Sequence, residues 1–191
     1  MSLTIEEKYE LIKKNLKEQK SKNPIEIIKS LMHSDFIDMH GPEHHFLDGA
    51  CFMRALYNAG LEFDFDSALD TFAQRTIKMP GAMCGLWGVC GSVASLGAVF
   101  ALLDGTGPLS QDESYKSHME FTSSVIKKMS EIGGPRCCKR NAFISIMYGV
   151  QYAKSHYNIN IELPSNIECE FSNFNKQCIG NKCPFNKVEN K

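Results

Sequence analysis

Apolar residues recur every three or four positions along most of the chain, and almost no segment alternates with a period of two. The clearest case is residues 4–20, where Ile5 and Leu16 lie on one helical face between charged residues. Thr4 stands at the N-cap position, and Glu7 follows three residues later as its capping-box partner. This stretch therefore predicts an amphipathic surface helix.

The same period predicts further helices, each with a recognisable start or stop signal. Pro24 occupies a first helical position, while Gly60 and the run Gly133-Gly134-Pro135 follow helix ends. The predicted helices cover about residues 24–33, 42–58, 66–77, 79–103, 110–132 and 137–157. From Asn158 onward the chain is polar and aperiodic apart from three cysteines. The pattern indicates an all-α, single-domain bundle of about seven helices with an irregular, cysteine-containing C-terminal tail.

We expect three regions within this one structural domain. Residues 1–34 form amphipathic helices that pack on the core, residues 35–157 form the helical core with the Cys/His site, and residues 158–191 form the cysteine-rich tail. The boundaries follow the changes from amphipathic to apolar to aperiodic sequence. No segment repeats with a period of 30 to 50 residues, so a repeat architecture is not predicted.

The uncharged stretch from Met79 to Leu103 allows two interpretations. Its length and apolar character are those of a membrane span. It also carries five glycines, two serines and two cysteines, and it lacks flanking aromatic or basic anchors beyond Lys78. The favoured interpretation is a buried, Gly-rich central helix whose small residues let neighbouring helices approach closely, within one chain or across a homodimer.

Composition and charge remove several classes of function. The 191 residues carry 21 Lys and Arg against 22 Asp and Glu, a formal net charge of −1, which gives no global attraction for nucleic acid or an anionic membrane. The eight cysteines are the unusual feature. The first ten residues show no secretory signal. We therefore expect a cytoplasmic protein whose cysteines are reduced thiols or metal ligands.

The run His40-Gly-Pro-Glu-His-His gathers three imidazoles and a carboxylate within six residues. His40, His44 and His45 are candidate metal ligands, and Cys51 follows on the same helical stripe as His44. His44 and Cys51 would lie about 10 Å apart along the helix, so a second segment must complete any site. Glu43 or His44 could handle protons in a redox reaction. The competing interpretation is that the histidines cap the helix.

Cys84 and Cys90 flank a glycine-rich stretch within the apolar segment. In one continuous helix they would point about 120° apart and could not meet. If the helix starts near Gly88 instead, the two thiols can share a site at a helix N-terminus, where backbone N–H groups bind an anion or lower a thiol pKa. Both are candidate metal ligands, and the alternative is that they pack as small hydrophobic residues.

Cys137 and Cys138 are the candidate catalytic thiols. With Pro135 at the first helical position, both would lie in the first turn of a helix, beside three flanking cations. The helix dipole and these cations favour the thiolate form. Adjacent helical residues point about 100° apart, so one thiol can react while the other packs.

The tail carries Cys169, Cys178 and Cys183, followed by Pro184. Three cysteines within fifteen residues are typical of a metal or cluster ligand set, and we expect a metal or a disulfide to hold this polar segment. A fourth ligand is required, and His156, Cys137 or Cys138 could supply it.

These motifs resemble, in the same order, an uncharacterised prokaryotic domain-of-unknown-function family sometimes found beside radical-SAM or methyltransferase modules in anaerobes. The resemblance covers about residues 35 to 185. The segment Cys90-Gly91-Ser-Val-Ala-Ser-Leu-Gly97 with the later Cys pair is also similar to small helical redox proteins with a Gly-Cys-Ala-x-x-Gly motif, although this chain has Val89-Cys90-Gly91 there. Both resemblances imply thiol or metal chemistry and neither implies a substrate.

Two hypotheses remain. The first is a soluble protein that binds zinc or an iron–sulfur cluster, or carries out thiol redox chemistry, at an interior site; if it is an enzyme, an oxidoreductase is the favoured class. Its partner would be a redox protein or a small molecule. The second is a non-catalytic helical binding module for a cofactor or protein partner, with a structural zinc or a disulfide in the tail.

Overall fold

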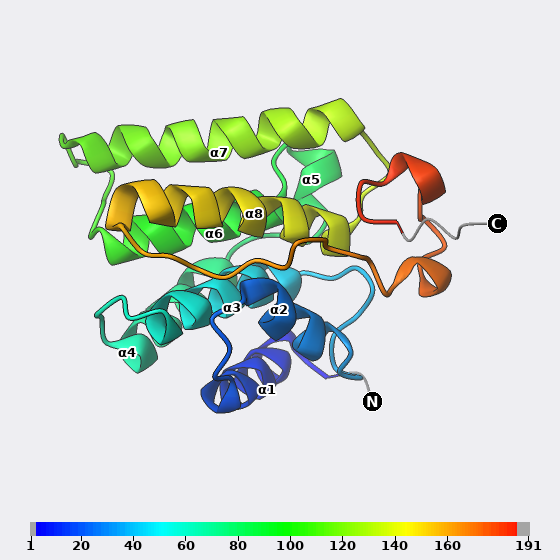
Figure 1. Cartoon of the computed structure of the whole chain (residues 1–191), viewed down its shortest axis with the longest axis horizontal. Coiled ribbons are helices and arrows are strands. Elements are labelled where there is room, and N and C mark those ends of the chain that lie inside the picture. The colour runs from blue at the N-terminus through cyan, green and yellow to red at the C-terminus, as the bar shows by residue number, and fades with distance from the viewer. Residues whose placement is uncertain (1–2, 187–191) are drawn as a thin grey trace.

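The computed structural model describes residues 3–186, and these residues form an all-helical structure (Figure 1). This confirms the predicted fold class. The α-helices are α1 (Ile5–Glu18), α2 (Pro24–Met32), α3 (His44–Asn58), α4 (Phe65–Thr76), α5 (Met83–Leu86), α6 (Gly91–Leu103), α7 (Glu113–Ile132) and α8 (Cys138–Tyr157). Two 3₁₀ turns, η1 (Ser172–Phe174) and η2 (Gly180–Lys182), lie in the C-terminal segment.

The N-terminal helices begin where their capping residues predict. The Glu7 N–H donates to Thr4 Oγ1 at 3.2 Å, and the Thr4 N–H donates to Glu7 Oε2 at 2.7 Å, which completes the capping box of α1. The Asn23 side chain accepts from the first turn of α2, with Pro24 at its start. Both helices pack on α3, which is buried along most of its length.

The uncharged stretch forms two helices rather than one, which corrects the continuous helix over 79–103. The short α5 ends at Leu86, the chain turns through Gly88 at a φ of +70°, and α6 begins at Gly91. A positive φ is favourable for glycine and costly for other residues, so Gly88 sets the break. Within residues 3–186, no helix combines the length and the apolar character needed to cross a membrane.

Helix α6 is the buried, Gly-rich centre of the bundle, as predicted, and it packs against α3, α4, α7 and α8. Small residues permit these contacts. A Cβ at Gly49 of α3 would lie 2.7 Å from Ser95 Oγ, and a Cβ at Gly97 would lie 2.7 Å from Thr122 Cγ2 of α7. Distances below 3 Å leave no room for a side chain, so glycine sets the separation of these helices.

The C-terminal segment runs back along α8 and folds over its N-terminal end (Figure 1). Two aromatic side chains anchor it there, because Phe171 and Phe185 are 5% and 6% exposed. The Phe185 ring meets Phe143 of α8 edge-on, with centroids 5.4 Å apart. This path brings the three tail cysteines to the start of α8.

Candidate functional site

The candidate residues meet at the N-terminal end of α8. The helix begins at Cys138, and Cys137 is its N-cap in an extended conformation, so the prediction that Pro135 starts the helix is wrong. The Cys137 side chain takes the place of the usual serine or aspartate cap, because its Sγ accepts the Arg140 N–H at 3.4 Å. The two neighbouring cysteines consequently project in different directions.

The first pocket, called the tail pocket here, lies between the start of α8 and the C-terminal segment. The cysteines that line it are Cys137, Cys169, Cys178 and Cys183. Of the three residues considered as a fourth partner for the tail, Cys137 lines this pocket. His156 contacts Asp104 Oδ2 at 3.0 Å instead.

Each thiol of the tail pocket accepts a main-chain N–H from two or three residues further along the chain. The donors to Cys137, Cys169 and Cys178 are Arg140, Phe171 and Gly180, each at 3.4 Å. Phe185 provides the corresponding donor to Cys183. Such bonds fix the direction of a sulfur and stabilise its negative charge.

Burial and neighbouring thiols weaken the acidity of two tail cysteines. Burial raises the pKa of Cys169, and the neighbouring Cys137, Cys183 and Cys178 raise it further. Burial also raises the pKa of Cys183, with a smaller contribution from Cys137. Mutual repulsion of this kind shows that the four sulfurs share one electrostatic environment.

The second pocket, called the interior pocket here, lies between α3, α5, α6 and the start of α8. The lining residues whose side chains could bind a metal are His44, His45, Asp48, Cys84, Cys90, Cys137 and Cys138. The turn at Gly88 brings Cys84 and Cys90 to one cavity. The sequence predicts this arrangement for the case in which the helix starts near Gly88. Cys137 lines both pockets, whereas Cys138 lines only this one.

The acidity of Cys138 is opposite to the prediction from the helix dipole and the flanking cations. Burial, together with the smaller effect of the nearby Asp48 carboxylate, raises its pKa to about 12. Burial also raises the pKa of Cys90, against the hydrogen bond that Asn141 donates to its sulfur at 3.2 Å. Desolvation therefore outweighs the dipole at both positions.

The three histidines of the predicted cluster have different surroundings. His40 uses both ring nitrogens: Nδ1 accepts the Cys138 N–H at 3.4 Å, and Nε2 lies 3.1 Å from Asn175 Oδ1. Burial lowers the pKa of His40, and it lowers the pKa of His45 as well. Within the described part of the chain, the Nδ1 atoms of His44 and His45 are buried without a hydrogen-bond partner, and His44 Nδ1 lies 3.5 Å from Asp48 Oδ1. His40 thus ties α8 to the tail, while His44 and His45 each have a ring nitrogen without a hydrogen bond.

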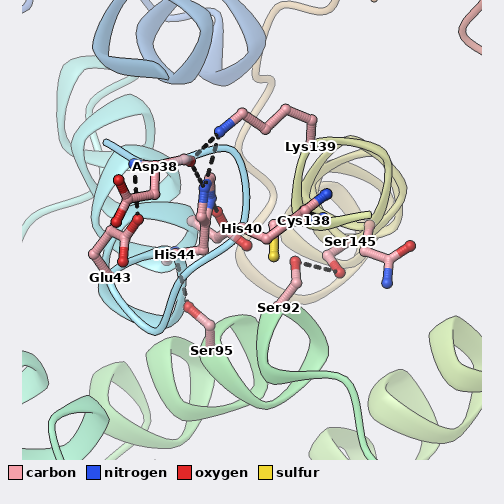
Figure 2. A network of polar contacts seen from close by, with 12 residues as sticks. Asp38, His40, Glu43, His44, Ser92, Ser95, Cys138, Lys139 and Ser145 are labelled. Carbon is pink, nitrogen blue, oxygen red and sulfur yellow. Dashed lines mark hydrogen bonds and ion pairs between the residues drawn. The ribbon is translucent and has the colours of Figure 1, made fainter. Parts of the chain in front are cut away.

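Figure 2 shows how the first turn of α3 is joined to α8. The Lys139 ammonium donates to the Asp38 carbonyl at 2.6 Å and lies 3.1 Å from His44 Nε2. Burial lowers the pKa of Lys139, which is 1% exposed, and its ammonium also lies 5.5 Å from the centre of the Phe171 ring. A buried cation therefore connects the loop before α3, α8 and the tail.

Besides His40, two predicted residues line neither pocket. Glu43 accepts the Asp38 N–H at 2.9 Å and lies 3.8 Å from Lys8, so its carboxylate braces the loop before α3. Cys51 is completely buried in the hydrophobic core, where burial raises its pKa well above the usual value.

Sequence reasoning did not single out Asn141 and Asn175. The Asn175 amide donates to Cys137 Sγ at 3.6 Å, and Asn141 donates to Cys90 Sγ. Neither asparagine belongs to a recognisable motif, and Asn175 lies 38 residues from its sulfur partner. In residues 3–186, no three His, Cys, Asp or Glu side chains converge at the distances of ligands around a single metal ion.

A wide groove adjoins the interior pocket. It has a volume of about 680 Å³ and lies between α5, α7 and the loop before α8. Ile126 and Met129 provide apolar lining, and Arg136 lies at its border. Because Cys84 and Cys90 line both spaces, a small molecule in the groove can reach the interior thiols.

The substitution Gly91→Ala tests how tightly the interior pocket is packed. A Cβ at Gly91 would lie 2.1 Å from His45 Cδ2, so we expect the imidazole to be displaced and the free energy of unfolding to fall by about 1–3 kcal/mol. Urea denaturation measures the change. Gly85→Ala is the matched control, because a Cβ there meets nothing within 4 Å. Equal stability of the two variants would contradict this packing.

Comparison with known proteins places most of the chain in one family. Residues 12–186 match a family of unknown function (DUF5714). No curated protein and no solved structure matches the chain. The match confirms the resemblance to a domain-of-unknown-function family, while the similarity to the Gly-Cys-Ala redox proteins stays a prediction. Since the match covers nearly the full length, the chain belongs to this family of unknown function, DUF5714.

Proposed function

We propose that the protein holds a thiolate-bound metal centre, zinc or an iron–sulfur cluster, in the tail pocket. The ligands are Cys137, Cys169, Cys178 and Cys183. The observation that carries the proposal is that all four sulfurs face one pocket and each accepts a main-chain N–H. Hydrogen bonds to sulfur are the usual way in which a protein orients and tunes thiolate ligands.

The donor set fits soft metals. Thiolates select zinc, iron–sulfur clusters or Cu(I), and four cysteines are the commonest ligand set for both zinc and four-iron clusters. Around a single zinc ion with Zn–S bonds of 2.3 Å, tetrahedral thiolates lie about 3.8 Å apart. The four cysteines are not yet at such mutual distances in residues 3–186, so binding of one ion must draw them together.

The consequence for function depends on which centre forms. An iron–sulfur cluster would make the protein an electron carrier or an oxidoreductase with a redox partner. Zinc would have a structural role and hold the C-terminal segment in place. The protein would then be a non-catalytic binding module whose groove takes a small molecule. The expected cytoplasmic location belongs to the same proposal, because reduced thiols are the form that binds metal.

The test is elemental analysis and an ultraviolet–visible spectrum of full-length protein purified without oxygen. Iron with acid-labile sulfide and broad absorption near about 400 nm identifies a cluster, whereas one zinc per chain identifies the structural centre. Cys178→Ser, at the most exposed of the four thiols, should lower the metal content at least about fivefold.

Cys51→Ala is the matched control, because this thiol lies in the core away from the pocket. It should keep the metal content of the wild type. Wild-type protein that contains neither metal after anaerobic purification and reconstitution would overturn the proposal. So would equal loss of metal in the control variant.

A further inference from the structure

The interior pocket concentrates buried polar atoms that have no partner. Among residues 3–186, six buried side-chain nitrogen or oxygen atoms have no hydrogen-bond partner. Four of them lie within five residues of α3: His44 Nδ1, His45 Nδ1 and both carboxylate oxygens of Asp48. Unpaired buried polar atoms are rare in folded proteins, and a cluster of them points to a missing ion or water.

Asp48 is the strongest of these signals. Its side chain is completely buried, and His44 Nδ1 lies 3.5 Å from its Oδ1. The Lys139 ammonium, which could have neutralised it, is instead bonded to the Asp38 carbonyl and His44 Nε2. His44 is charged only when it is protonated, so its long contact with Asp48 leaves the buried carboxylate poorly compensated, and the folded chain gains from a cation bound at this position.

The groups around Asp48 are those that bind transition metals. The same pocket contains the imidazole of His45 and the thiols of Cys90 and Cys138. Mixed imidazole, thiolate and carboxylate donors suit zinc and iron rather than magnesium or calcium. The pocket has a volume of about 30 Å³, which is room for one ion with a water molecule.

Neighbouring groups hold two of these donors in place. The Asn141 amide donates to Cys90 Sγ, and the backbone N–H groups of Ser92 and Val93 also face this sulfur at the start of α6. The Gly41 N–H faces the Cys138 sulfur. Such outer partners orient metal ligands.

We propose that the interior pocket binds a second transition-metal ion, zinc or iron, with Asp48, His45, Cys90 and Cys138 as its ligands. The donors surround the cavity without meeting at one point, so binding rotates the side chains inward. Four protein ligands would complete a tetrahedral shell, as in a structural metal site, and Cys90, which also lines the groove, would place one of them beside the groove.

The test uses Co²⁺ as the probe and the full chain with the tail pocket disabled by Cys169→Ser and Cys183→Ser. Metal-free protein of this double variant should still bind about one equivalent of Co²⁺ and show thiolate-to-cobalt charge-transfer absorption. Wild-type protein should bind more than this variant. The difference in Co²⁺ stoichiometry between wild-type protein and the double variant tests the tail centre. The Co²⁺ that the double variant still binds tests the interior site.

Asp48→Asn in the same background separates a ligand from a structural residue. The affinity for Co²⁺ should fall at least about 100-fold, while the Tm of the metal-free protein should rise by about 2–4 °C because an unpaired carboxylate has been removed. A merely structural aspartate would give a lower Tm. Asp104→Asn is the matched control, because Asp104 also contacts imidazoles but lies at the opposite end of α6.

Cys90→Ser provides a second variant in case Asp48→Asn fails to fold. It should remove part of the charge-transfer absorption and weaken Co²⁺ binding. If the double tail variant binds no Co²⁺, or if the Asp48 and Cys90 substitutions leave its affinity unchanged, the interior metal site is refuted. Either result leaves the tail centre to be judged by its own metal analysis.

Discussion

Phe100→Ala should cost about 3–5 kcal/mol of the free energy of unfolding. Phe100 lies in α6 and is completely buried. Its ring contacts Phe121 of α7 edge-on at 4.9 Å between centroids and Tyr152 of α8 at 4.2 Å. Removing it therefore opens a cavity where three helices meet, and the surrounding rings are too rigid to fill it.

Urea denaturation followed by circular dichroism measures this loss. Met119→Ala is the control, because Met119 is 57% exposed on α7 and should change the stability by less than about 0.5 kcal/mol. A loss below about 1 kcal/mol for Phe100→Ala would mean that α6 is not the packed centre of the bundle.

Removal of the metal proposed for the tail pocket should release the C-terminal segment. Apart from its buried aromatic rings and the buried Ile161 and Ile167, the segment is held by polar contacts such as the ion pairs of Glu170 with Lys29 and His33. Partly exposed ion pairs of this kind contribute about 0–1 kcal/mol each. Structural thiolate centres contribute far more, so most of the stability of this segment should come from the metal.

Limited digestion with trypsin measures the release. In metal-free protein, cleavage after the exposed Lys176 and Lys182 should be at least about tenfold faster than in metal-loaded protein. Cleavage at Lys127 and Lys128 within α7 serves as the internal reference and should not change. Equal rates at the tail sites in both forms would show that packing alone holds the segment.

The helices were predictable because their signals are local. Thr4 and Asn23 start α1 and α2, and Gly133 ends α7, all through contacts within a few residues. The sequence did not decide whether the helix breaks at Gly88, because a glycine inside an apolar run permits both a helix and a turn.

The site was predictable only as a set of residues. The sequence offers Cys137 as one of three possible fourth partners of the tail cysteines without choosing among them, and it does not reveal that His40 bonds with Asn175 across 135 positions. It also could not weigh the helix dipole against desolvation at Cys138, because burial there depends on α3 and α6 packing over the sulfur. Long-range contacts of this kind have no periodic pattern in the chain.

The first turn of α8, with its two adjacent cysteines, lines both the tail pocket and the interior pocket. Cys137 caps the helix and lines both pockets, while the next residue lines only the interior one. A shift of this single turn must move sulfur atoms on both sides at once. If an ion bound at one of the proposed sites shifts this turn, it changes the affinity of the other site, and by reciprocity the second ion changes the affinity of the first site by the same factor.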